Sequence, residues 1–170
     1  MVDCLFAIPG DITLPTGGYA YDRRVLALLP GCGVAARHVA LPGAFPFPTD
    51  ADLAETERLL ATEPADARLL IDGLAFGALP ADLVTRIRQP IVALCHHPLF
   101  LETGLSELRR RSLYQTERMA LVFAADVIVT SPMTARIVAA EFAVAPERIT
   151  VAEPGTDPAP RADSATCGPV

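Results

Sequence analysis

The stretch Val2-Asp-Cys-Leu-Phe-Ala-Ile-Pro-Gly-Asp-Ile-Thr-Leu-Pro-Thr-Gly-Gly18, followed by Tyr19-Ala-Tyr-Asp-Arg-Arg-Val-Leu-Ala-Leu-Leu29, decides the fold. Residues 2–8 are almost continuously apolar, which is typical of a strand buried on both faces of a parallel sheet. Residues 9–18 are rich in Pro, Gly, Asp and Thr, and residues 19–29 place apolar side chains at helical spacing. The stretch therefore predicts a first, central strand, a glycine loop and a helix.

The same alternation continues through most of the chain. Further strands are expected at residues 34–41, 67–71, 91–95, 127–130 and 149–152, and helices at residues 52–62, 80–88, 105–123 and 132–142. Such alternation predicts an α/β, Rossmann-like three-layer domain with an open, mostly parallel sheet covered on both faces. Because ligands of these sheets bind outside the carboxyl ends of the strands, we expect functional residues directly after each strand.

Composition narrows the class of protein further. With 170 residues, of which 51% are hydrophobic, the chain can bury the core of one ordinary domain. No apolar run reaches the ~18 residues that cross a bilayer, and the N-terminus lacks a signal-peptide pattern, so we expect a cytoplasmic protein without a transmembrane segment. The four cysteines are widely scattered, which favours buried thiols over a zinc site or a redox pair.

Charge argues against nucleic acid as a partner. The net charge is −6 and the chain contains no lysine, whereas phosphate-binding surfaces are basic. Arg109-Arg110-Arg111 is the exception. A solvated helix face is the favoured interpretation of this cluster, and an anionic lipid headgroup or acceptor is the alternative.

The chain ends in a segment unlike the rest. Residues 158–170 are rich in Pro, Gly and Ala, which is typical of a linker between domains. We therefore expect residues 1–157 to form one Rossmann-like domain, and residues 158–170 to lead toward a further domain.

Two glycine patterns invite comparison with phosphate-binding loops. Gly17 and Gly18 lie between the first strand and its helix, where backbone amides and the helix dipole favour an anion. The alternative is a flexible turn that needs positive φ. Residues 31–36 match G-x-G-x-x-A but follow a helix and precede a strand, the reverse of dinucleotide-binding order, so they are interpreted as a helix-ending turn.

Polar residues follow the third and fourth predicted strands. His96 and His97 directly follow residues 91–95 and point to opposite faces if extended, so the pair is a poor metal chelate. One imidazole is expected to face the cleft and the other to pack or face solvent. Asp72, Glu102 and Thr103 are placed to hydrogen-bond a polyhydroxylated ligand, and a capping or turn role is equally open for each.

The order of these motifs resembles the N-terminal domain of GT-B glycosyltransferases, specifically the retaining family 4 group. The matching pieces are Pro15-Thr-Gly-Gly18 leading into Tyr21-Asp-Arg-Arg-Val-Leu26, Ala93-Leu-Cys-His-His97, Glu117-Arg-Met-Ala-Leu121 leading to Ala125-Asp-Val-Ile-Val-Thr-Ser131, and Pro146-Glu-Arg-Ile-Thr-Val151 leading to Pro154-Gly-Thr-Asp157. The resemblance covers nearly the whole chain and depends on motif order more than on any single motif.

The resemblance implies a two-domain enzyme that transfers a sugar from a nucleotide donor with retention and without a bound metal or other cofactor. It implies that Gly17 and Gly18 contact the donor diphosphate and that His96 lies beside the transferred sugar. Because the N-terminal domain of such enzymes mainly binds the acceptor, we expect Asp72, His97, Glu102 and Thr103 to bind a sugar, glycan or glycolipid acceptor. The nucleotide sugar would be held by a C-terminal domain with an E-x7-E element, so we expect this chain to be inactive alone. A peripheral membrane contact is compatible with a glycolipid acceptor. The alternative is a stand-alone sugar- or phosphate-binding module without catalysis.

Overall fold

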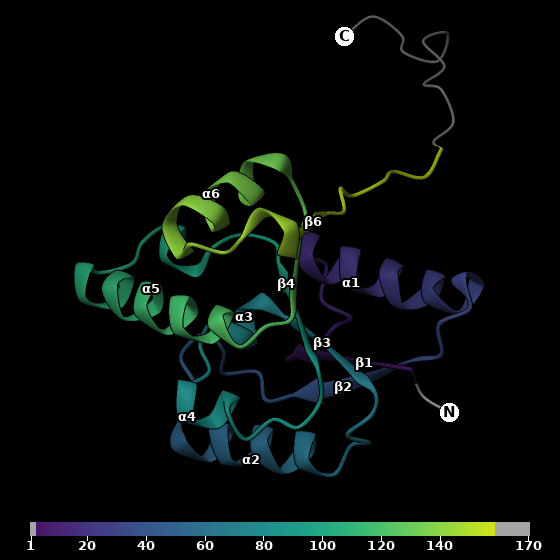
Figure 1. Ribbon diagram of the computed structural model, residues 1–170, viewed down its shortest axis with the longest axis horizontal. Helices are drawn as coiled ribbons and strands as arrows, with labels where there is room; N and C mark the ends of the chain where they lie inside the picture. The colour runs from purple at the N-terminus through teal and green to yellow at the C-terminus, as the bar shows by residue number, and fades with distance from the viewer. Residues whose placement is uncertain (1–2, 159–170) are drawn as a thin grey trace, which may run out of the picture.

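A six-stranded parallel sheet forms the centre of the computed structural model, which describes residues 3–158 (Figure 1). The strands are β1 (Cys4–Pro9), β2 (Ala36–Leu41), β3 (Arg68–Asp72), β4 (Ile91–Cys95), β5 (Asp126–Val129) and β6 (Ile149–Val151). They lie in the order β2-β1-β3-β4-β5-β6, and every neighbouring pair is parallel. The predicted α/β Rossmann-like class is confirmed.

The position of β1 differs from the expectation of a central strand. It lies inside the sheet but second from one edge, and β3 and β4 occupy the middle. The reason is the direction of the crossovers: β2 adds on one side of β1, whereas β3 to β6 all add on the other. The chain order reverses at β1 and β3, so the ligand-binding crevice expected for such sheets lies beside these two strands.

The helices follow the predicted order, with one further short α-helix and three short 3-10 helices. They are α1 (Gly17–Leu28), α2 (Asp50–Ala61), α3 (Gly73–Phe76), α4 (Ala81–Val84), α5 (Glu107–Val122) and α6 (Pro132–Phe142), with short 3-10 helices η1 (Leu29–Cys32), η2 (Leu99–Leu101) and η3 (Pro146–Arg148). The helix expected at residues 80–88 is shorter in the structure: α4 ends at Val84, with Thr85 as its C-cap. Gly33, with φ 79°, ends η1, which confirms the helix-ending turn.

The two faces of the sheet are covered unequally. On one face the larger core joins the sheet to α2, α3, α4, α5 and α6, and includes Leu60, Phe76, Leu113 and Val138. On the other face Phe6, Ile8, Leu70 and Leu94 pack against α1. Figure 1 shows α1 to the right of the sheet, opposite α5 and α6. Within residues 3–158, α1 is the only α-helix on its face, and Ile12 from the loop before it packs on the same side.

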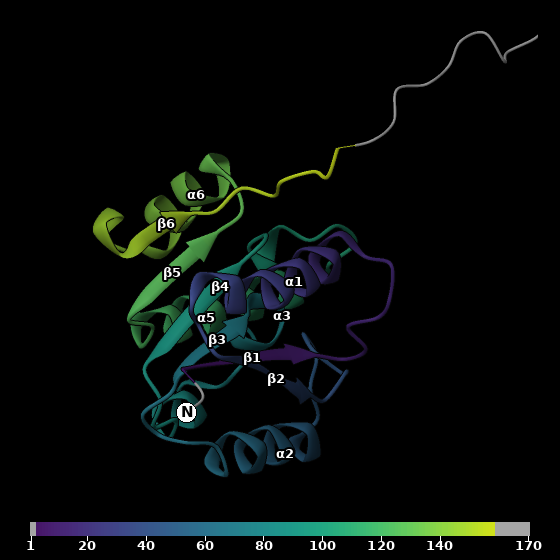
Figure 2. The ribbon, with the colours of Figure 1, turned by 90° about the vertical axis from the view of Figure 1, so that its right-hand side faces the viewer.

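The segment after β6 runs alongside α1 (Figure 2). The Tyr21 hydroxyl donates to the carbonyl oxygen of Ala152 over 2.9 Å, and Arg24 pairs with Asp157 at 2.7 Å. These contacts fix the last described residues beside the middle of α1. Most of the predicted linker, residues 159–170, lies outside the described residues.

The structure can be compared with the expectations about the cysteines, membrane-spanning helices and the arginine cluster. Cys95 is buried and Cys4 is half-buried, but Cys32 is exposed on η1, so the expectation of buried thiols was wrong for that residue; Cys167 lies outside the described residues. None of the helices within residues 3–158 is both long enough and apolar enough to span a bilayer. The predicted solvated face is observed: Arg109 and Arg111 are exposed on α5.

Candidate active site

The carboxyl ends of β3 and β4 meet the first turns of α1 at the crevice beside β1. Asp72 is the last residue of β3, and it pairs in register with Leu94, so His96 follows β4 directly beside it. Asp22 approaches from α1, whose buried face carries that one fully buried residue. The fold thus gathers an imidazole and two carboxylates from three separate elements.

The three side chains are hydrogen-bonded through one nitrogen of the imidazole. His96 Nε2 lies 3.0 Å from Asp22 Oδ1 and 3.4 Å from Asp72 Oδ2. The side chain of Asp22 is 0% exposed, whereas that of His96 is 24% exposed. Asp22 Oδ2 is buried without a hydrogen-bond partner among the described residues. The group is therefore anchored inward at the carboxylates and reaches the surface through the imidazole.

The electrostatics of this group favour a charged imidazole. Burial acts to lower the pKa of His96, but hydrogen bonds to Asp22 and Asp72, together with their charges, outweigh it and raise the pKa to about 9. Burial raises the pKa of Asp22, and the hydrogen bond with His96 opposes that rise. At neutral pH the imidazolium compensates the two buried carboxylates, which would otherwise be costly to desolvate.

The same group could be compared with a metal centre, because its three candidate ligand atoms lie within 4.8 Å of one another. However, the 3.0 Å contact between His96 Nε2 and Asp22 has the length of a direct hydrogen bond. We therefore interpret the three side chains as a proton-sharing group.

The start of α1 offers unpaired backbone donors at the same crevice. Thr16 is the N-cap, and its hydroxyl accepts from the amide of Tyr19 over 3.2 Å. The amides of Gly17 and Gly18, in the first turn, have no acceptor within residues 3–158. Neither glycine has positive φ, so the flexible-turn alternative was wrong for both. A Cβ on Gly18 would lie 3.8 Å from His96 Cδ2, which places Gly18 beside the imidazole.

The loop after β4 is held by hydrogen bonds from the end of β5, from α6 and from α5. The carbonyl oxygen of His96 accepts from the hydroxyls of Thr130 at 3.2 Å and Thr134 at 3.5 Å. Glu117 of α5 accepts from the amide of Leu99 at 2.9 Å, at the start of η2. Burial raises the pKa of Glu117 to about 8, so its neutral form is favoured. The backbone that carries His96 is therefore held by fixed hydrogen bonds.

The other predicted acceptor residues are not gathered at this group. Asp72 is 4% exposed; its Oδ1 accepts from the amide of Leu74 at 2.8 Å and its Oδ2 faces His96. It therefore caps α3 and contacts the imidazole, a position that leaves little surface for an acceptor. His97, Glu102 and Thr103 are exposed on the loop after β4. One histidine of the pair thus faces the crevice and the other faces solvent, as the extended backbone predicted.

Sequence reasoning missed Asp22 and Glu117. Both lie on helix faces that otherwise bury apolar residues: Asp22 is on the side of α1 that meets the sheet, and Glu117 shares the buried face of α5 with Leu113 and Leu121. The available signal was a carboxylate at a position where helical spacing predicts a buried, apolar residue. Such a carboxylate is rarely buried without a partner.

Comparison with known proteins gives one family match. A model of the family described as Glycosyltransferase Family 4 matches residues 27–160. The matched region includes Asp72, His96 and Glu117 but begins after Gly17, Gly18 and Asp22. A search of curated proteins found no match.

Proposed function

Because the chain belongs to glycosyltransferase family 4, we propose that it is the N-terminal, acceptor-side domain of a nucleotide-sugar-dependent retaining glycosyltransferase with a GT-B fold. In this proposal a C-terminal domain holds the nucleotide sugar, and residues 158–170 belong to the linker that leads to it. The chain alone then has only one wall of the active-site cleft and transfers no sugar.

One observation carries the proposal: at the carboxyl edge of the sheet, the amides of Gly17 and Gly18 at the start of a 12-residue helix have no acceptor within residues 3–158, and Gly18 lies beside the half-buried imidazole of His96. The amides and the positive end of the helix dipole favour a phosphate. The imidazolium adds a positive charge beside it. This combination suits a donor diphosphate better than a neutral sugar.

The chemistry assigns a role to each part. When the bond between the sugar anomeric carbon and the diphosphate breaks, negative charge develops on the leaving diphosphate. Fixed donors at Gly17, Gly18 and His96 stabilise that charge more in the transition state than in the ground state. We propose that His97, Glu102 and Thr103, which are exposed on the neighbouring loop, contact the sugar, glycan or glycolipid acceptor. No metal or other cofactor is required in this scheme.

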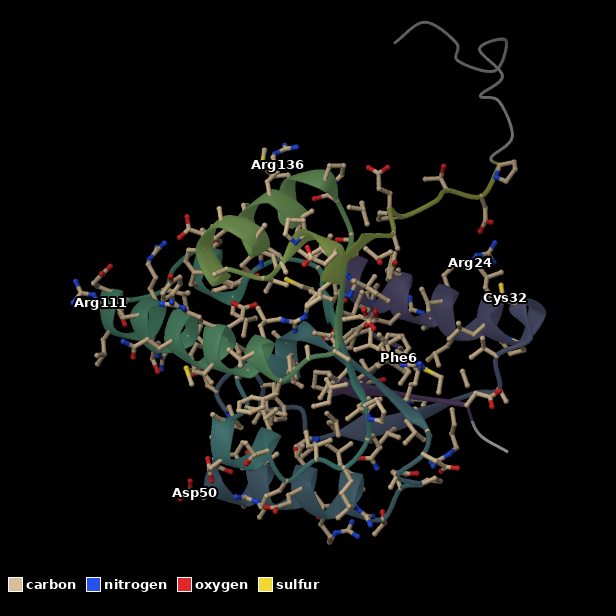
Figure 3. The ribbon with its side chains drawn as sticks, in the orientation of Figure 1. Phe6, Arg24, Cys32, Asp50, Arg111 and Arg136 are labelled. Carbon is tan, nitrogen blue, oxygen red and sulfur yellow. The ribbon has the colours of Figure 1, made fainter. Side chains whose placement is uncertain are left out.

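A glycolipid acceptor would place the enzyme at a membrane, and α5 has a surface suited to that contact. Leu108, Met119 and Val122 are exposed at 79%, 50% and 63%. Arg111 and Arg118 lie on the same exposed side of the helix, and Figure 3 shows Arg111 at its outer end. Apolar side chains flanked by arginines are typical of a helix that rests on an anionic bilayer. We propose this surface as the peripheral membrane contact.

Calorimetry on the chain tests the proposed function against the stand-alone binding module. Titration with inorganic pyrophosphate should give weak binding, on the order of millimolar. Titration with a panel of nucleotide sugars should show no tight complex, because the nucleotide-binding half is lacking. Micromolar or tighter binding of a nucleotide sugar would instead establish the stand-alone module.

Activity provides the second arm of the test. A sugar-transfer assay on the chain together with its C-terminal donor-binding domain should give turnover, and His96→Gln should reduce it strongly while leaving the protein folded. Gln is preferable to Ala here because it retains a hydrogen-bond donor for the buried carboxylate of Asp22. Unchanged turnover in His96→Gln would refute the assignment of His96.

A further inference from the structure

We propose that Asp22 is the positioning residue of the site: it holds His96 as an imidazolium whose Nδ1–H is the donor presented to the ligand, so that His96 is not a general base. Only the identity of that ligand rests on the proposed glycosyltransferase function. The arrangement of the three side chains does not depend on that function.

The hydrogen bonds determine which nitrogen is free. Nε2 is engaged by Asp22 at 3.0 Å and lies 3.4 Å from Asp72. Nδ1 makes no hydrogen bond within residues 3–158. With both carboxylates directed at Nε2, that nitrogen must carry a proton, since a lone pair facing two carboxylates would be repelled. The nitrogen left for a ligand is therefore Nδ1.

The packing of α1 explains why Asp22 can reach the imidazole. Gly18 precedes Asp22 by one helical turn and lies on the same side of the helix. A Cβ on Gly18 would be 3.8 Å from Cδ2 and 3.9 Å from Nε2 of His96. Thus α1 contacts the Cδ2–Nε2 edge of the ring through its smallest residue and its buried carboxylate. The opposite edge, which carries Nδ1, is not covered by this helix face.

The remaining groups around the ring support a fixed, charged imidazole. Tyr21 of α1 contacts the ring edge to face, with centroids 5.2 Å apart. Asp22 from α1 and Asp72 from β3 are the acidic groups that act on His96, and Arg23 is the cation that acts on Asp22. On the side of β5 and α6, the hydroxyls of Thr130 and Thr134 bind the backbone carbonyl and leave the ring free. Both carboxylates thus favour the imidazolium.

Nitrogen-15 NMR of the histidine side chains tests this proposal on the chain as it stands. In the unsubstituted protein at about pH 7.5, both ring nitrogens of His96 should be protonated. In Asp22→Asn the pKa of His96 should fall by about one to two pH units, because one of two nearby negative charges is removed. A neutral His96 in the unsubstituted protein, or an unchanged pKa in Asp22→Asn, would overturn the proposal.

Asp72→Asn is the matched comparison. Asn retains an oxygen that can cap α3, so this variant removes the charge while preserving the cap. Because Asp72 lies 3.4 Å from Nε2, against 3.0 Å for Asp22, the pKa of His96 should fall less in Asp72→Asn than in Asp22→Asn. An equal or larger fall in Asp72→Asn would assign the positioning role to Asp72 and contradict the proposal.

The unsubstituted protein keeps the test decisive even if Asp22→Asn fails to fold, since its NMR spectrum alone shows whether Nδ1 and Nε2 are both protonated. The result is also independent of the proposed function. A charged His96 together with no sugar transfer by the two-domain protein would sustain the positioning role and refute the glycosyltransferase assignment. Transfer activity with a neutral His96 would sustain the glycosyltransferase assignment and refute the positioning role of Asp22.

Discussion

At the residue scale, the first two amides of α1 are available because Thr16 caps the third. The Thr16 hydroxyl accepts from Tyr19, and the amides of Gly17 and Gly18 have no acceptor among the described residues. The contribution of each glycine to the site depends on the space beside it as much as on its backbone amide. A side chain at position 18 would point toward His96, whereas position 17 has nothing within 4 Å.

Substitution of Gly18 should therefore depend on side-chain size. Ala fits, because its Cβ would make an ordinary contact of 3.8 Å with His96. Val adds two methyl groups that crowd the imidazole and the phosphate position, and should weaken pyrophosphate binding about tenfold, or about 1.4 kcal/mol. Calorimetry measures pyrophosphate binding by the Ala and Val variants. Gly31→Val, in open space on η1, is the control, and equal losses in the two valine variants would contradict the site assignment.

Gly73 illustrates a different constraint, close approach of two backbone segments. A Cβ at this position would lie 2.8 Å from the carbonyl oxygen of Leu94 and 3.3 Å from the Cα of Cys95. Because these are backbone atoms, they cannot rotate away, and Gly73→Ala should lower the free energy of unfolding by about 1 to 3 kcal/mol. Urea unfolding measures this loss. The prediction fails if Gly73→Ala unfolds at the same midpoint as Gly31→Ala, whose new Cβ meets nothing within 4 Å.

At the element scale, α5 has two faces with different tasks. Its buried face carries Leu113, Ala120 and Leu121 into the core, and Glu117 from that face holds the loop after β4. Its opposite face leaves large apolar side chains exposed beside arginines, although the whole chain is acidic, with a net charge of −6. The first face supports the site, and the second is the proposed membrane contact.

Vesicle sedimentation tests that contact. The chain should bind vesicles that contain phosphatidylglycerol and should not bind vesicles of phosphatidylcholine alone, because the arginines need anionic headgroups. Raising the salt concentration should weaken binding. The double substitution Leu108→Ser and Val122→Ser should reduce binding several-fold, whereas Leu28→Ser, an exposed apolar residue on α1, should not. Equal vesicle binding by the double variant and by Leu28→Ser would contradict the proposed membrane contact.

At the scale of the whole molecule, two raised pKa values act on stability in the same direction. Glu117 has a pKa of about 8 in the folded chain and 4.5 as its ordinary value, so the unfolded chain loses this proton first as pH rises. His96 has a pKa of about 9 and an ordinary value of 6.5, so the folded chain retains a proton that the unfolded chain has lost. In both cases the folded state binds more protons, and stability falls as pH rises.

Urea unfolding should therefore show higher stability at about pH 5 than at about pH 9, with a slope of up to ~1.4 kcal/mol per pH unit for each group. Glu117→Gln should flatten the decline in the free energy of unfolding between pH 4.5 and about pH 8. His96→Gln should flatten the decline in the free energy of unfolding between pH 6.5 and about pH 9. A stability that rises over this range in the unsubstituted chain would contradict both assignments.

The amino-acid sequence by itself determined the class and order of the fold. Hydrophobic periodicity is local, so β4 and α6 were predicted with the bounds that the structure has, and the parallel sheet follows from strict alternation of strands and helices. Local order also placed Gly17 and Gly18 between the first strand and its helix, and His96 directly after a strand. Short elements were less predictable: α3 depends on the cap from Asp72, and η2 depends on Glu117, which binds it from another helix.

Only the tertiary structure decided which of these residues act together. Asp22 and His96 are 74 positions apart, and the hydrogen bond between them depends on α1 crossing to the far face of the sheet. Asp72 likewise became a cap and an imidazole contact because β3 and β4 are neighbours in register. Periodicity specifies which side of a helix is buried, but the partner of a buried charge is set by how distant elements pack. For that reason the glycines and histidines at this edge were predictable, and the carboxylate that positions His96 was not.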